Sequence, residues 1–215
     1  FHIKHRGESR GVGGIFYEHG HRLIASSVGV LTIGMTVWLW RVDPRRWMRR
    51  LGVAALAAVI LQGLLGGITV LYFLPTAVSV SHAGLAEIFF CLTVCLALFT
   101  SSGWRRSGTT GRHTPVTLHS TDLTAMALAT GLPALAFAQI LVGATMRHTG
   151  AGLAIPDFPL VFGGVVPNEW TFPIAVHYTH RLGAGMTALV IFATVRQIAI
   201  HHRDRPDLLR PAGLL

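Results

Sequence analysis

Histidines near one end of three apolar segments are the residues best able to do chemistry in this chain. They are His21, His82 and His180. Neutral imidazole is a good ligand for iron, and facing helices of a bundle build metal and cofactor sites from their side chains. No thiolate stands nearby, and the carboxylates are too few for a di-iron site. The residue types therefore favour iron held between two imidazoles, as in a heme, with His21 and His82 as the natural pair.

Long apolar runs must position these histidines. The chain has 215 residues, of which 51% are hydrophobic and 13% charged, whereas a soluble domain carries about 25% charged residues. The apolar runs lie at residues 17–40, 50–72, 80–101, 119–146 and 173–198. Each is long enough to cross the ~30 Å hydrocarbon layer as a helix. We therefore predict an all-α, polytopic membrane helix bundle with five transmembrane helices.

Basic residues gather in alternate connections between these runs. Eleven arginines lie in the first connection, the third connection and the tail: Arg41, Arg45, Arg46, Arg49, Arg50, Arg105, Arg106, Arg112, Arg203, Arg205 and Arg210. The other connections, 73–79 and 147–172, hold only Arg147. The positive-inside rule then places the start of the first run outside and the tail inside, although Lys4, Arg6 and Arg10 are exceptions. The net charge of +9 thus reports membrane topology, and we expect no nucleic-acid partner.

This orientation brings all three histidines to the outer end of their helices. One histidine at a helix end is ordinarily an interfacial residue, but three at one depth favour a shared site, because ionisable groups within a membrane are costly. Arg22 and Arg181 directly follow two of them. An arginine there can bind a propionate carboxylate with two hydrogen bonds or reach lipid phosphate, and both interpretations stay open.

Two further features lie in the second and third runs. The run from Gln62 to Val70 contains Gly63, Gly66 and Gly67, and small residues let either another helix or a flat macrocycle approach closely. Glu87 lies about two turns into the third run; its carboxyl group would be neutral, paired or part of a proton path. A hydrogen bond between Glu87 and Gln62 is an equal alternative.

A short internal repeat relates the first and fifth runs. Residues 18–25 (EHGHRLIA) match residues 177–184 (HYTHRLGA) at four of eight positions. If His21 pairs with His82, two runs later, then His180 needs a partner two runs beyond the fifth. The repeat therefore predicts two further helices after this chain and one before it, so that the chain holds five of eight. The start at Phe1 agrees with an internal piece of a longer protein.

Several motifs resemble the heme A synthase family. They are Glu-x-x-His-Arg at 18–22, Gln-Gly-x-x-Gly-Gly-x-Thr-Val at 62–70, Ser-His-x-x-Leu-Ala at 81–86, the segments 149–153 and 156–159, and His-Arg at 180–181. They follow in order from about residue 16 to 200. The resemblance implies an eight-helix membrane enzyme of two four-helix halves. Such an enzyme oxidises the C8 methyl of heme O to a formyl group through successive hydroxylations, making heme A for terminal oxidases and so serving cytochrome oxidase assembly.

The resemblance also implies residue roles. His21 and His82 would be axial ligands of the substrate heme O, and His180 would hold a heme b cofactor with a partner outside this chain. Arg22 and Arg181 would contact heme. Glu18 would be catalytic. It lies one helical turn before His21 on the same face, where its carboxylate could accept a proton or stabilise positive charge at the methyl carbon.

These expectations divide the chain into five parts. Residues 1–16 form an outer loop, 17–101 the N-terminal half with the substrate-heme site, 102–118 a basic cytoplasmic loop, 119–200 the start of the C-terminal half on the cofactor-heme side, and 201–215 a cytoplasmic tail or loop. One departure from the family pattern is the run Ile-Pro-Asp-Phe at 155–158, where a cysteine and a tryptophan are common.

The expected location is the cell inner (plasma) membrane, with the heme-ligand ends of the helices on the periplasmic side. The expected partners are the lipid bilayer, heme O synthase and an electron-transfer protein; a homo-oligomer is left open. Two alternatives use the same histidines. A membrane cytochrome b-type electron carrier has no need of Glu18 and tends to place hemes on both sides of the bilayer. A non-catalytic heme-binding assembly protein would release its heme unchanged.

Overall fold

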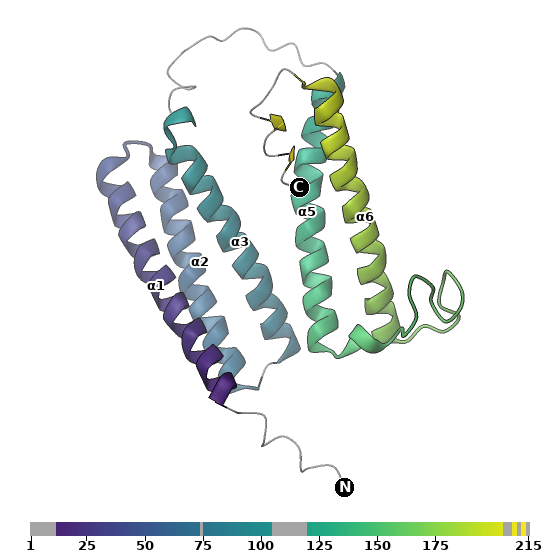
Figure 1. Cartoon of the computed structure of the whole chain (residues 1–215). Helices are drawn as coiled ribbons and strands as arrows, with labels where there is room; N and C mark the ends of the chain where they lie inside the picture. The colour runs from purple at the N-terminus through teal and green to yellow at the C-terminus, as the bar shows by residue number, and fades with distance from the viewer. Residues whose placement is uncertain (1–11, 74, 105–119, 204–207, 210–211, 214–215) are drawn as a thin grey trace.

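Five long helices make up almost all of the described chain (Figure 1). The computed structural model describes residues 12–73, 75–104, 120–203, 208–209 and 212–213. The helices are α1 (Val12–Val42), α2 (Arg46–Leu71), α3 (Thr76–Thr100), α5 (Ser120–His148) and α6 (Phe172–His201), with a short 3-10 helix, η1 (Ala151–Leu153). Within the described residues the only β pairing is an isolated bridge between Val161 and Gly164. The predicted all-α class is confirmed.

All five long helices have the length and composition of membrane spans. Large apolar side chains point outward along them; Leu31 is 71% exposed, Leu189 70% and Phe192 68%. In water such surfaces would drive aggregation, but in lipid they are the stable arrangement, since the backbone is satisfied within each helix. The chain is therefore part of a multi-pass membrane protein, as predicted.

The helices extend beyond several of the predicted runs. Residues 12–16 of the expected outer loop already belong to α1, α2 begins at Arg46 rather than 50, and α3 begins at Thr76 rather than 80. Apolar counting marks where the hydrocarbon layer begins, whereas a helix continues into the headgroup region as long as its hydrogen-bonding pattern continues. The basic loop predicted at 102–118 lies mostly outside the described residues.

The helices pack in chain order. Contacts join α1 to α2, α2 to α3, α3 to α5 and α5 to α6, whereas the backbones of α1 and α3 do not approach each other closely in the described part of the chain. Figure 1 shows the start of α1, the α2–α3 connection and the α5–α6 connection at the same end of the molecule, the lower end in that view. Segments carrying the candidate histidines thus lie at one end, which we call the histidine end.

The tightest apolar packing lies at the other end of the first three helices. Leu39, Met48, Ala55 and Leu96 form a buried cluster there. Gly52 lets α1 and α2 approach closely, because a Cβ at this position would lie 3.1 Å from Leu39 Cδ1. The histidine end is therefore held by polar contacts and the opposite end mainly by apolar packing.

Candidate functional site

His82 rests on the face of α2 at the histidine end. The Gln62 amide nitrogen donates a hydrogen bond to the main-chain carbonyl of His82 at 3.0 Å and lies 3.4 Å from the ring nitrogen Nε2. Gly66, one turn along α2, faces the ring: a Cβ there would lie 3.2 Å from His82 Cε1. We call Gln62 and Gly66 the first cradle. A larger residue at Gly66 would press on the imidazole.

The same arrangement recurs between α5 and α6. The Gln139 amide nitrogen donates to the main-chain carbonyl of His180 at 2.6 Å and lies 3.0 Å from the ring nitrogen Nδ1. A Cβ at Gly143 would lie 2.9 Å from His180 Cε1. Gln139 and Gly143, which we call the second cradle, have the spacing of Gln62 and Gly66. A Cβ at Gly183 would overlap Gln139 Oε1, so this glycine is needed for the close approach of α6.

Two buried polar atoms at the first cradle have no hydrogen-bond partner among the residues that the structure describes. They are Oε1 of Gln62 and Nδ1 of His82. Buried polar atoms are nearly always paired, so an unpaired acceptor and an unpaired ring nitrogen on two contacting side chains indicate a site that changes when a ligand binds. A ring held by a neighbouring helix, with one nitrogen atom, Nδ1, not engaged by the described protein groups, suits an axial heme ligand. The imidazole of His82 and its surroundings therefore fit a heme ligand.

His21 stands on α1 and is exposed. It lies close enough to His82 for the two imidazoles to interact electrostatically. Glu18 occupies the preceding turn of α1, and its side chain is not among those described. Arg22 is exposed, and its carbonyl accepts a hydrogen bond from Ser26 at 2.8 Å. The structure thus brings the predicted pair His21 and His82 to one end of the three-helix group. The ligation itself stays a prediction.

Arg181 organises the connection between α5 and α6. Its guanidinium donates to the main-chain carbonyls of Asp157 at 2.7 Å, Leu160 at 3.1 Å and Ile155 at 3.0 Å. It also lies 5.6 Å from the centre of the Phe158 ring. From the sequence, a heme propionate and a lipid phosphate were both open as partners of the Arg181 guanidinium. The structure adds a third role, in which the converging carbonyls of a loop hold the cation.

His177 belongs to the same loop contact. It is buried, with the Ile155 amide 3.2 Å from Nδ1 and the Arg181 Nε 3.2 Å from Nε2. Both ring nitrogens therefore face donors of the protein, which leaves none directed at a metal. His177, at the position that Glu18 occupies in the first copy of the repeat, fastens the loop to α6.

Asp157 closes a tight turn in this loop. Its carboxylate accepts hydrogen bonds from the amides of Gly163 and Phe162, both at 2.9 Å. Gly163 has a φ of +78°, which glycine adopts readily. The hydrogen bonds from Gly163 and then Phe162, together with the nearby positive charge of Arg181, lower the pKa of Asp157. Asp157 is therefore ionised at all ordinary pH values and keeps the loop in one shape.

The second cradle was not predicted from the sequence. Gln139 and Gly143 stand alone in an apolar helix, and no periodic pattern marks them. The available signal was the shared spacing Gln-x-x-x-Gly at 62–66 and 139–143. The suggested bond between Glu87 and Gln62 is absent from the described contacts, because the amide of Gln62 binds His82 instead.

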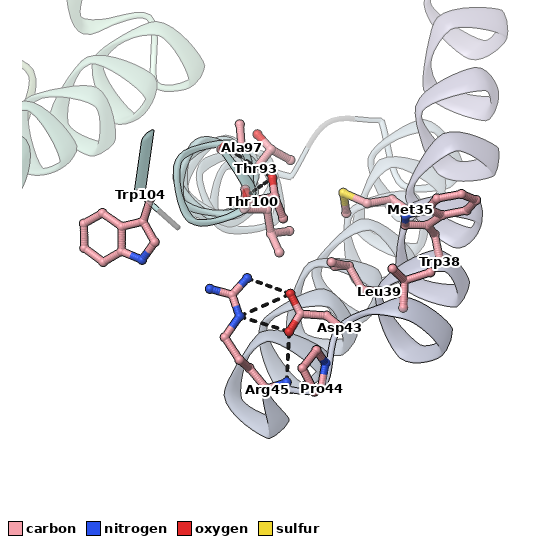
Figure 2. Close-up of a pocket in the computed structure, with 12 residues that line it drawn as sticks. Met35, Trp38, Leu39, Asp43, Pro44, Arg45, Thr93, Ala97, Thr100 and Trp104 are labelled. Carbon is pink, nitrogen blue, oxygen red and sulfur yellow. Dashed lines mark hydrogen bonds and ion pairs between the residues drawn. The ribbon is translucent and has the colours of Figure 1, made fainter. Parts of the chain in front are cut away.

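A cavity of about 640 Å³ lies at the end opposite the histidines (Figure 2). Met35, Trp38 and Leu39 of α1 face Thr93, Leu96 and Ala97 of α3 across it. Arg45 and Asp43 form an ion pair of 2.6 Å at its edge, and Arg45 also donates to the carbonyl of Phe99 at 3.2 Å. The pair raises the pKa of Arg45. With its charges already paired, this cavity is apolar and separate from the histidines.

Known proteins of one family match almost the whole chain. Residues 11–215 match the family model described as cytochrome oxidase assembly protein. The chain is 28% identical over 207 residues to the heme A synthase of Symbiobacterium thermophilum, covering 91% of this chain and 63% of that protein. It is 30% identical over 175 residues to the heme A synthase of Shouchella clausii, covering 81% and 56%. For the Rhizobium etli heme A synthase the values are 29% over 199 residues, 84% and 51%.

The chain thus spans a little over half the length of these curated relatives. The matched region includes all five helices and both cradles. The chain belongs to the cytochrome oxidase assembly protein family.

Proposed function

We propose that the protein of which this chain is part is a heme A synthase, which oxidises the C8 methyl of heme O to a formyl group. The observation that carries the proposal is the placement of His21 and His82 at one end of α1–α3, near enough to interact electrostatically, with Glu18 one turn before His21 in the same helix. Family membership and relatives named heme A synthase support it.

In this proposal each residue of the first half has a separate task. His21 and His82 would hold the substrate heme through its iron, and the first cradle would support His82. Glu18 shares the helix face of His21, one turn nearer the outer surface. A carboxylate there can accept a proton or stabilise positive charge that develops at the methyl carbon. Arg22 can bind a propionate at the membrane surface.

The second half has a different task. His180, backed by Gln139 and Gly143, would ligate a heme b that exchanges electrons, together with a histidine outside this chain. Bound heme b would supply one-electron redox chemistry. The equivalent of Glu18 is His177, whose ring nitrogens face the Ile155 amide and Arg181. This difference supports chemistry in one half and electron transfer in the other.

The proposed setting follows from the charge pattern. The protein would lie in the cell inner membrane with the histidine end facing the periplasm. It would take heme O from heme O synthase and exchange electrons with a redox partner. All three candidate ligands lie at one end of the helices, whereas electron transfer across the bilayer requires hemes at both sides. The cytochrome b-type alternative is therefore less well supported.

The test is heme analysis of the full-length protein. Expressed in a host that makes heme O, the wild-type protein should yield heme A or its hydroxylated intermediate in extracted hemes separated by chromatography. Glu18→Ala should retain bound heme and lose both products. The control is Glu169→Ala, which changes an exposed carboxylate in the loop before α6. Unmodified heme O alone, from intact wild-type protein with its redox partner present, would contradict the proposal and favour the non-catalytic alternative.

A further inference from the structure

Gln62 and Gln139 occupy positions where a glutamine is costly unless it is paired. Both lie within helices that have the composition of membrane spans. An amide buried in apolar surroundings without partners costs a few kcal/mol. Each side chain instead donates to the main-chain carbonyl of a histidine on the next helix, at 3.0 Å for Gln62 and 2.6 Å for Gln139. A helical carbonyl has a second lone pair, so this bond leaves the histidine's own helix intact.

The carbonyl bond fixes the amide to the backbone of the histidine and not only to its ring. The same amide then reaches the ring, at Nε2 of His82 and at Nδ1 of His180. The glycine one turn further along, Gly66 or Gly143, lets the Cε1 edge of the ring approach the neighbouring helix closely. Each imidazole is therefore restrained at its edge by an amide and on one side by helix backbone.

The two cradles differ in which ring nitrogen of the histidine the glutamine faces. Gln139 faces Nδ1 of His180, which leaves Nε2 of that ring directed away from the glutamine. Gln62 faces Nε2 of His82, while Nδ1 of His82 and Oε1 of Gln62 are both buried and unpaired. A turn of the His82 ring about its Cβ–Cγ bond exchanges its two edges and can pair these two atoms. The first cradle thus holds its histidine in a form that ligand binding would change.

We infer that Gln62 and Gln139 are positioning residues, which orient His82 and His180 as axial ligands, and that Gln62 also tunes the heme iron through His82. This inference rests on the proposed ligation of heme by these histidines. In the ligated form Gln62 Oε1 accepts the Nδ1 hydrogen of His82, so that Nε2 is free for the iron. An acceptor behind a ligand histidine fixes its tautomer and raises its basicity, and its loss typically lowers metal affinity about 10- to 100-fold.

The test compares two replacements of Gln62 in the full-length, heme-loaded protein. Gln62→Leu keeps the size of the side chain but removes the acceptor, so we expect heme affinity to fall roughly 10-fold or more and the midpoint potential of that heme to rise. Gln62→Glu keeps an acceptor and makes it anionic, so the potential should move the opposite way. A merely structural role would not reverse the sign between the two variants.

The glycines provide an independent readout with matched controls. Gly66→Ala and Gly143→Ala place a methyl group against the imidazole and should change the low-spin electron paramagnetic resonance spectrum of the corresponding heme. Gly63→Ala on α2 and Gly131→Ala on α5 add the same methyl where no other group lies within 4 Å, and should leave the spectra unchanged. The comparison separates ring displacement from a general effect of alanine on helix stability.

The outcomes distinguish this inference from the function on which it rests. If His82→Ala removes the low-spin signal while Gln62→Leu and Gln62→Glu leave affinity and potential unchanged, the positioning role is wrong and the ligation stands. If His82→Ala itself leaves the spectrum unchanged, the proposed ligation is wrong. Opposite shifts of the heme midpoint potential in the two Gln62 variants would support both the positioning role and the ligation.

Discussion

At the scale of single residues, the histidines at the histidine end differ in the protein groups that surround their rings. His82 and His180 each rest on a glutamine and a glycine of the adjacent helix. His177 lies one turn before His180, yet the Ile155 amide and Arg181 face its two ring nitrogens. A cofactor ligand needs a free nitrogen directed at the metal, whereas a histidine that fastens a loop uses its nitrogens within the protein.

This difference predicts opposite results for two alanine variants of the full-length protein. His82→Ala should abolish the low-spin spectrum of the N-terminal heme, because it removes an axial ligand. His177→Ala should keep the spectra of both hemes while loosening the loop between α5 and α6, because it removes contacts to Ile155 and Arg181 and no proposed iron ligand. Optical and electron paramagnetic resonance spectra of the purified variants check both. If His177→Ala lost a heme signal and His82→Ala did not, the roles of ligand and loop contact would have to be exchanged between the two histidines.

At the scale of elements, the helices were predictable and the contacts between them were not. The thickness of the hydrocarbon layer sets a minimum length for any spanning helix, so the five apolar runs predicted the five helices. Their ends were off by a few residues because helices continue past the apolar boundary.

The partners of Gln139 and Arg181 depend on neighbouring segments that meet only after folding. Gln139 binds a carbonyl of α6, and Arg181 binds three carbonyls of the preceding loop. The carbonyls that Gln139 and Arg181 bind have no signature in sequence spacing, although the shared Gln-x-x-x-Gly spacing marks Gln139 as a counterpart of Gln62. The internal repeat marked the position of His180 and Arg181, but not what would hold them.

The loop between α5 and α6 should respond to acid through Asp157. Its pKa is lowered by the amides of Gly163 and Phe162, so the ionised form stabilises the folded loop. That contribution is complete above the unfolded pKa of about 3.9 and is lost as the pH falls through the lower folded pKa. Fluorescence of Trp170, which stacks edge-to-face on Tyr178 at 5.5 Å, can report the change in a variant with the other tryptophans replaced.

We expect a transition in Trp170 emission centred below about pH 3.9 for the wild-type loop. Asp157→Asn removes the titrating group, so its emission should stay constant over the same range apart from any global unfolding. Far-ultraviolet circular dichroism of the same samples monitors the helices. A transition of equal midpoint in both proteins would show that another group controls the loop.

At the scale of the whole molecule, the two ends of the bundle have different characters. The histidine end contains the cradles, the candidate ligands and the loop fastened by Arg181. The opposite end contains the apolar cluster and the Asp43–Arg45 ion pair beside the cavity. Arginines concentrate at this second end, at Arg41, Arg45, Arg46, Arg49 and Arg50. The asymmetry predicts a single orientation in the membrane, with the histidine end outside.

Cysteine labelling of intact cells tests this orientation. Phe158→Cys places a thiol in the loop at the histidine end, where the side chain is 83% exposed. Arg203→Cys places one just after α6, at an exposed position of the other end. A membrane-impermeant maleimide should label the first variant in intact cells and the second only after the membrane is opened. The native Cys91 and Cys95 lie within α3, and their replacement by alanine gives the background for both variants. Labelling of Arg203→Cys alone in intact cells would invert the topology. It would then place His21, His82 and His180 at the cytoplasmic face and require heme to enter and leave from that side.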